Sequence, residues 1–336
     1  MGVRPGVVHK AALLAKADLT TELVKEFTEL QGIVGGLYAR VQPLDDDLKP
    51  EVQAEVAKAI YDHYKPESME DDVPRTVEGA VVSIADKADS IAGMFALGLV
   101  PSGSKDPFAL RRQANGIVKT IAEHKLPFRL SEMMNDARAR YKGSEAEKKF
   151  TNSDYTGAIR NFFRERLEFY LKEAHGYAYD VINAVLAADS EDVVDAVARA
   201  EAVAKVRGSA DFASISVAFK RTKNILRQAT ENKRTIAGVV DIVSLREESE
   251  KELAVLVPQT AGVVEKLRAT RDYHGSLLEI AKLRPAVDRF FDEVMVMVDD
   301  DNLRANRLAL LQTLVKEFST IADFSEIVTE GKESTN

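Results

Sequence analysis

Basic side chains cluster in one part of the chain, with a spacing that suits contact with nucleic acid. Residues 213–234 contain six cations against one acid, Glu231, which gives a local charge of 6 − 1 = +5. On a helix, Lys220, Lys223 and Arg227 would share one face, because they are separated by three and four residues. A basic stripe in a chain of net charge −8 indicates contact with a phosphate backbone. The alternative is a solvated face whose cations pair with neighbouring glutamates.

Motifs that support catalysis are missing from the sequence or incomplete. None of the five histidines belongs to a His-x-x-x-His pair, no Gly-x-Ser-x-Gly elbow is present, and the chain has no cysteine. Gly98 and Gly103 have the spacing of a phosphate-binding loop, but there Lys precedes Ser or Thr, whereas here Ser104 precedes Lys105. We therefore expect no catalytic residue and no nucleotide-binding loop.

Acidic residues are grouped at three places that read as loops or helix starts, namely Asp45–Asp47, Glu70–Asp72 and Asp299–Asp301. Negative charge is favourable at the N-terminus of a helix, where it complements the macrodipole. We interpret these groups as solvated turns and expect no metal site.

Composition favours a helical protein of a reducing compartment. The chain has 336 residues, 45% of them hydrophobic, with only 18 glycines and 10 prolines. The absence of cysteine points to the cytoplasm, where disulfides are rare. No apolar run approaches the roughly 20 residues of a membrane-spanning helix, so we expect no membrane partner.

Hydrophobic spacing predicts an all-α fold without a sheet. Asp106 and Pro107 form a good helix start, because Asp caps free N–H groups and Pro suits the first turn. We expect Asp106 to cap a helix from Pro107 and to direct Phe108 and Leu110 into the core. The expected helices cover about 8–40, 51–64, 77–97, 107–124, 130–141, 155–172, 178–187, 191–206, 211–230, 236–255, 259–282, 285–297 and 301–323.

Three segments resemble the β subunit of bacterial-type glycyl-tRNA synthetases. They are Glu26–Gly32 with Tyr38-Ala39; Ile84–Ser90 running into Pro101–Arg112; and a C-terminal set of Phe219–Ile225, Phe290–Met297 and Leu303–Leu311. The second is the most specific, and the three occur in the family's order over nearly the whole chain. The resemblance implies the C-terminal half of such a subunit, and the helical pattern that begins at His9 also suggests that the natural chain starts further upstream.

The resemblance implies a fold, partners and cofactors. It implies an HD-like helical domain over 1–125, an intermediate helical region over 126–210, and a helical bundle over 211–336 with a DALR-like anticodon-binding domain. It also implies part of an α2β2 glycine-tRNA ligase whose partners are glycine tRNA and the α subunit. The whole enzyme uses ATP and magnesium, but adenylate chemistry belongs mainly to the α subunit. We therefore expect no cofactor in this chain and no activity from it alone.

Two other function classes stay open. An HD-type metal phosphohydrolase needs a His-Asp doublet as metal ligands, and the sequence has no His-Asp dipeptide, which leaves Asp86 as at most a relic of a ligand. A helical scaffold without a nucleic-acid role would require carboxylate partners for Lys220, Lys223 and Arg227.

The anticodon-binding role implied by the resemblance adds further candidate contacts to the basic stripe: Asn224, Arg304, Asn306 and Arg307. The asparagines suit the edges of unstacked bases, and Arg304 and Arg307 share a helix face. For Arg304, pairing with Asp299–Asp301 is the alternative. In the motif Lys105, Asp106, Arg111 and Arg112, we favour internal ion pairing by the two arginines over contact with tRNA.

Overall fold

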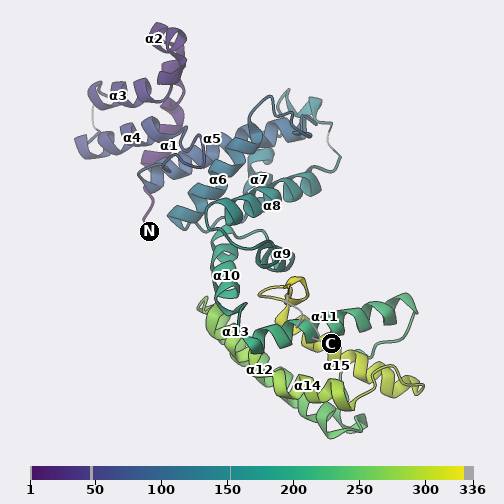
Figure 1. Ribbon diagram of the computed structural model, residues 1–336. Coiled ribbons are helices and arrows are strands. Elements are labelled where there is room, and N and C mark those ends of the chain that lie inside the picture. The colour runs from purple at the N-terminus through teal and green to yellow at the C-terminus, as the bar shows by residue number, and fades with distance from the viewer. Residues whose placement is uncertain (1, 46–47, 152, 329–336) are drawn as a thin grey trace, which may run out of the picture. The chain divides into compact units, whose positions relative to one another are not determined.

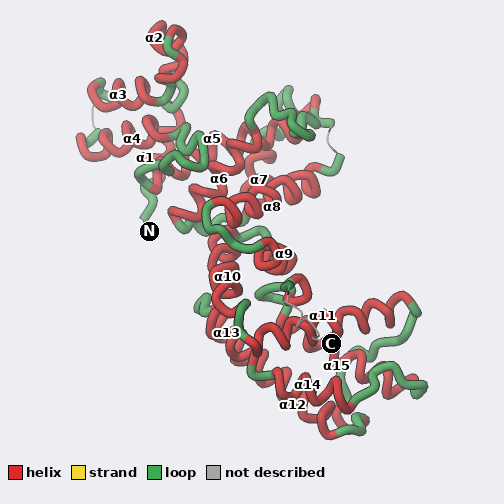
Figure 2. Tube along the Cα trace, in the orientation of Figure 1, coloured by secondary structure: helices red, strands yellow, loops and turns green. Residues whose placement is uncertain are grey.

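The protein is helical throughout the part that the computed structural model describes, residues 2–45, 48–151 and 153–328 (Figures 1 and 2). Within these ranges there is no β-strand, and the only bridges are Ser102 with Lys105 and Arg129 with Asp192. The all-α prediction is confirmed. Asp46 and Asp47 of the first acidic group lie outside the described residues.

The chain packs as two compact units. Unit 1 comprises Met1–Ala174 and Glu191–Val194, and unit 2 comprises His175–Ser190 and Asp195–Asn336. The residues of the expected intermediate region, 126–210, therefore contribute to both units. Figure 1 labels the helices of each unit.

Unit 1 is built around one long helix. Its helices are α1 (Pro5–Leu14), α2 (Glu22–Glu26), α3 (Ile33–Val41), α4 (Pro50–Asp62), α5 (Val77–Ala96), α6 (Leu110–His124), α7 (Leu130–Ala139) and α8 (Tyr155–Glu173). The α5 helix contacts α1, α4, α6, α7 and α8. It begins where the Thr76 hydroxyl accepts a hydrogen bond from the Gly79 N–H at 3.0 Å. Its buried side chains, including Ile84, Ile91 and Phe95, form the core of the unit.

The expected helix over 8–40 is interrupted, so that prediction was wrong in its extent. A 3₁₀ turn over Ala17–Thr20 separates α1 from α2. The buried carboxylate of Asp18 accepts hydrogen bonds from the N–H groups of Gly32 (2.7 Å) and Gly35 (3.0 Å). These bonds hold the start of α3 against the turn, and Gly32 takes a φ of 77° that favours glycine.

Unit 2 contains α9 (Tyr179–Ala188), α11 (Ala210–Glu231), α12 (Glu248–Ala269), α13 (Tyr273–Ala281), α14 (Arg284–Glu293), α15 (Asp301–Phe318) and all but the first two residues of α10 (Val193–Val206). Every residue from Leu303 to Leu311 of α15 is buried. The α11 helix packs against α15 through Phe219 and Phe318, whose ring centroids lie 6.5 Å apart. The α15 helix is therefore the centre of this unit.

The expected helices over 236–255 and 259–282 were wrong in their boundaries. After α11 the chain forms a loop over 232–247 with one 3₁₀ turn, Ile242–Ser244, and α12 then runs through Pro258 without a break. A capping box between Glu247 and Glu250 starts α12. Pro258 is exposed. A proline within a helix removes one backbone hydrogen-bond donor, which favours a break in the helix but does not require one.

Candidate functional site

The basic face of α11 is open to solvent at two of its three cations. Lys220 and Arg227 are exposed, and neither makes an ion pair with any described residue. Lys223 is half-buried and pairs with the carboxylate of Asp323. The scaffold alternative required carboxylate partners for all three cations, so this arrangement favours the nucleic-acid interpretation at Lys220 and Arg227 only.

Lys223 joins α11 to the last turn of unit 2. Burial alone would raise the pKa of Asp323, but hydrogen bonds from Lys223 and Ser325 hold that pKa below its usual value. The backbone N–H of Asp323 also donates to the carbonyl of Ala184 at 2.7 Å. Lys223 therefore serves to fix the 3₁₀ turn Phe324–Glu326, and its charge is largely neutralised.

A hollow of about 370 Å³ lies beside this basic face. Asn224, the fourth predicted contact on α11, lines the hollow together with Lys220. The guanidinium of Arg221 is also part of the wall and lies 4.3 Å from the centroid of the Phe291 ring. Arg221 and the hollow were not singled out from the sequence, because the hollow is closed by Ile327, which lies about 100 residues after the lining residues of α11.

Arg304 is not available to RNA, which corrects the prediction for this residue. Its side chain is buried and pairs with Asp301. It also donates to the backbone carbonyls of Val298 (2.6 Å) and Asp299 (3.4 Å). The alternative interpretation, pairing with the acidic turn just upstream, is confirmed.

Asn306 is likewise committed within the protein, and the prediction that it reads a base was wrong. Its amide oxygen accepts from the Asp241 N–H, and its amide nitrogen donates to the Asp241 carbonyl, both at 2.8 Å. These two bonds fasten the loop 232–247 to α15.

Arg307 forms a buried ion pair with Glu250, so its predicted contact with RNA was also wrong. The Arg307 Nε lies 2.6 Å from Glu250 Oε2, and the two side chains are 5% and 0% exposed. Arg307 also donates to the carbonyl of Met295 at 2.9 Å. This arginine connects α15 with α12 and with the loop that follows α14.

Asp106 caps α6, but the helix begins at Leu110 and not at Pro107. The carboxylate accepts hydrogen bonds from the N–H groups of Leu110 (2.8 Å) and Arg111 (3.0 Å). Ala109 takes a left-handed conformation, φ 52°, and this delays the helix. Leu110 enters the core as expected, whereas Phe108 is 42% exposed, so the prediction for Phe108 was wrong.

Internal ion pairing by the two arginines of this motif is not observed. Neither Arg111 nor Arg112 pairs with a carboxylate of the described residues. Arg111 donates to the carbonyl of Lys105 at 3.4 Å, which helps to shape the loop, and Lys105 and Arg112 are exposed. The expected pairing was therefore wrong, and contact of this loop with tRNA stays a prediction.

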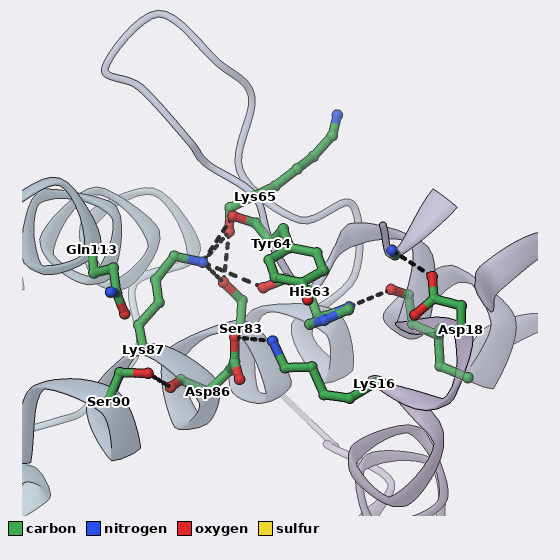
Figure 3. A network of polar contacts seen from close by, with 12 residues as sticks. Lys16, Asp18, His63, Tyr64, Lys65, Ser83, Asp86, Lys87, Ser90 and Gln113 are labelled. Atoms are coloured by element: carbon green, nitrogen blue, oxygen red, sulfur yellow. Dashed lines mark hydrogen bonds and ion pairs between the residues drawn. The ribbon is translucent and has the colours of Figure 1, made fainter. Parts of the chain in front are cut away.

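Figure 3 shows a polar network of unit 1 that includes Asp86, the residue that the sequence left as at most a relic of a metal ligand. The Lys16 ammonium lies 2.9 Å from Asp86 Oδ2 and 4.0 Å from the centroid of the Tyr64 ring. A lysine thus supplies the positive charge beside Asp86. Across 2–45, 48–151 and 153–328, no group of three or more His, Asp or Glu side chains has the arrangement of a metal site.

Lys87 holds the adjoining loop together from inside the same network. Its ammonium donates to the carbonyls of His63 (3.3 Å), Tyr64 (3.0 Å) and Lys65 (3.0 Å) and to the hydroxyl of Ser83 (2.8 Å), as Figure 3 shows. Burial lowers the pKa of Lys87 from 10.5 to about 8.

This pKa predicts a pH-dependent stability. Between about pH 8 and 10.5 the unfolded chain binds more protons at Lys87 than the folded chain, so the free energy of unfolding should rise with pH. The shift from 10.5 to about 8 corresponds to about 3 kcal/mol over that window. Denaturant unfolding between about pH 7 and 9.5 should show the rise in the native chain and lose it in Lys87→Met. An identical pH dependence in both proteins would contradict the lowered pKa.

Comparison with protein families agrees with the helical architecture. A family model described as glycyl-tRNA synthetase beta subunit matches residues 3–187, more than half of the 336 residues. The chain belongs to this family. A second model, described as DALR anticodon binding domain, matches residues 215–327.

Curated relatives of the glycyl-tRNA synthetase β family are similar over almost the whole chain. The protein named glycine–tRNA ligase beta subunit of Acidobacterium capsulatum is 55% identical over 323 residues, which is 95% of this chain and 44% of the relative. Those of Syntrophus aciditrophicus and Desulforamulus reducens are 42% and 41% identical over 325 residues each, again 44% of the relative. The chain thus spans less than half the length of these relatives.

Each of the two family matches covers a different one of the features described above. The β-subunit match covers the network of Lys16, Asp86 and Lys87 in unit 1. The anticodon-binding match begins within α11 at residue 215 and extends to residue 327, so it contains the exposed basic face and the hollow beside it. No helix among the described residues combines the length and apolar composition needed to cross a bilayer.

Proposed function

We propose that this chain binds glycine tRNA, with unit 2 placed on the anticodon arm. The observation that carries the proposal is the position of Lys220 and Arg227, exposed and without a carboxylate partner among the described residues, inside the segment that matches an anticodon-binding domain. Cations that are not neutralised by the protein can replace the counterions of phosphates, and release of those counterions favours binding.

The local charge is sufficient to oppose the general repulsion of an acidic protein. The net charge of −8 disfavours the approach of a polyanion, but the exposed cations of α11 and the residues just after it are concentrated on one segment. They are Lys220, Arg221, Arg227, Lys233 and Arg234. At a Debye length of about 8 Å in physiological salt, a phosphate at this segment would experience mainly these charges.

The wider role is that of part of a glycine-tRNA ligase in the cytoplasm. The relatives are named glycine–tRNA ligase beta subunit, and this name supports glycine tRNA as the ligand and an α subunit as the protein partner. ATP and magnesium would be used by the whole enzyme. The described residues present no fitting metal site, and we assign no step of the chemistry to them.

Selective binding of tRNA tests the proposal directly. We expect the chain to bind a glycine tRNA transcript more tightly than a transcript for another amino acid in fluorescence anisotropy at fixed salt. We also expect the apparent affinity to fall as salt is raised, because phosphate contacts release counterions. Equal affinity for both transcripts would contradict recognition of glycine tRNA, and absence of binding at low salt would remove the proposed function.

The chain alone should be unable to activate glycine. In an exchange assay with glycine, ATP and labelled pyrophosphate, we expect no label to enter ATP above the rate without protein. The reason is that the sequence contains no recognisable nucleotide-binding motif. Addition of an α subunit from a relative is the positive control, and exchange by the pure chain would contradict the assignment.

A further inference from the structure

The hollow beside the basic face of α11 has two chemically different parts. Its residues are Ser216, Val217, Lys220, Arg221, Asn224, Ile225, Gln228 and Ile327. Val217, Ile225 and Ile327 supply apolar surface, whereas Asn224 and Gln228 supply amides. At about 370 Å³ the hollow is near the lower end of the range for ligand pockets.

The two amides are free to bind a ligand. Asn224 and Gln228 are both exposed, and neither side chain has a hydrogen-bond partner within the part of the chain that the structure describes. A side-chain amide offers two donors and one acceptor oxygen, which is the combination needed to recognise the edge of a nucleobase.

The order of these side chains around α11 matches the layout of a nucleotide. At about 100° per residue, Lys223, Arg227 and Lys220 span an arc of about 60°. Asn224 lies about 40° beyond Lys220 on the same side, and Gln228 about 80° beyond it. The cations of α11 that can bind phosphates therefore lie beside the two amides that can bind a base.

The wall of the hollow also offers planar and apolar surface to a ring. The guanidinium of Arg221 lies 4.3 Å from the centroid of the Phe291 ring, and this contact holds its plane in place. Unstacked RNA bases commonly stack on arginine planes and on apolar side chains. The pair of Lys223 with Asp323 fixes the turn before Ile327, so Lys223 acts as a positioning residue for this wall.

We propose that the hollow receives one unpaired RNA base, whose edge is recognised by Asn224 and Gln228. Lys220 and Arg227 hold the flanking phosphates. This inference rests on the proposed binding of tRNA and adds the place where the nucleotide sequence is read. It also assigns a role to Gln228, which neither the basic stripe nor the family motifs indicate.

The test uses the double variant Asn224→Ala, Gln228→Ala and a set of glycine tRNA transcripts, each with one anticodon-loop nucleotide replaced. In anisotropy measurements at fixed salt, replacing the nucleotide at one loop position should lower the affinity of the native chain by about tenfold or more. This is the effect of losing a good two-point contact with a base. The double variant should lose discrimination at that position and keep it elsewhere. Its salt dependence should stay native, because amides make no phosphate ion pair.

A matched control is Gln259→Ala, which removes an exposed amide from α12 in the same unit. We expect the double variant and the control variant to keep the native melting temperature, because Asn224, Gln228 and Gln259 are all exposed. Equal loss of affinity for every transcript, or no change in discrimination, would overturn the proposed base site while leaving tRNA binding itself intact. If the native chain binds none of the transcripts, the proposed function fails together with the base site.

Discussion

Arg307→Met is expected to destabilise unit 2 by about 3–5 kcal/mol, because it leaves the charge of Glu250 buried without its partner. The guanidinium contacts Glu250 through Nε at 2.6 Å and through Nη2 at 3.1 Å. Burial would raise the pKa of Glu250, but hydrogen bonds from Arg307 and from two backbone N–H groups keep that pKa below its usual value. Hydrogen exchange of the amides in α12 and α15 measures the effect within this unit.

The double variant Arg307→Met, Glu250→Gln is the matched control. Glutamine keeps an oxygen that can accept from the N–H groups at the start of α12, and it carries no charge. We expect the double variant to be clearly more stable than the single one, since a buried pair costs less to replace than to break. Native protection in Arg307→Met, or a double variant as unstable as the single one, would contradict this role of the pair.

The second large effect is expected on binding of tRNA. Reversing two charges with Lys220→Glu and Arg227→Glu should weaken binding at low salt by more than about tenfold. It should also reduce the slope of log affinity against log salt by about 1.4–1.8, the contribution of two phosphate contacts. Lys223 is left unchanged, because Asp323 already neutralises it and its replacement would disturb the last turn.

A control with the same change in net charge separates local contact from general repulsion. Lys266→Glu with Lys282→Glu alters two exposed lysines on α12 and directly after α13, neither of which lines the hollow beside α11. Lys282 also gives up its exposed ion pair with Glu279, which contributes little to stability. We expect this variant to keep most of the affinity and nearly the native salt slope. If it weakens binding as much as the α11 variant does, the basic face has no special role.

Local sequence signals were sufficient for helices with clear caps and one apolar face. The range 77–97 predicted α5 to within one residue, since Thr76 supplies an N-terminal cap and the apolar spacing is regular. The sequence could also predict the exposure of Lys220 and Arg227, because the buried side chains Phe212, Ile215 and Phe219 mark an apolar side of α11. That side lies roughly 60–140° around the helix from the two cations.

The errors at Asn306 and Arg307 have a common physical cause. Their partners, Asp241 and Glu250, are 65 and 57 residues away in the sequence, and no local pattern reveals such pairs. Arg304 differs, because its carboxylate partner Asp301 is only three residues away. One signal was nevertheless present. Apolar residues occupy every side of the segment 303–314, and a helix that is apolar all round is buried, so its polar residues must be satisfied by the protein.

Long-range contacts also decided the roles of Lys223 and Asp86. Lys223 pairs with a carboxylate 100 residues further along the chain, and Asp86 with a lysine 70 residues earlier. Helical spacing places Lys223 on the basic face correctly but says nothing about which side chain meets it. The hollow beside α11 was missed for the same reason, because Ile327 reaches it only in the folded unit.

Chemical footprinting of glycine tRNA bound to the native chain tests the central claim most directly. Hydroxyl-radical cleavage should be suppressed in the anticodon stem and loop, where unit 2 is proposed to cover the phosphate backbone. The Lys220→Glu, Arg227→Glu variant should lose that protection. Protection confined to other parts of the tRNA, or protection of the anticodon arm that persists in this variant, would contradict the assignment of the basic face of α11 as the anticodon-binding surface.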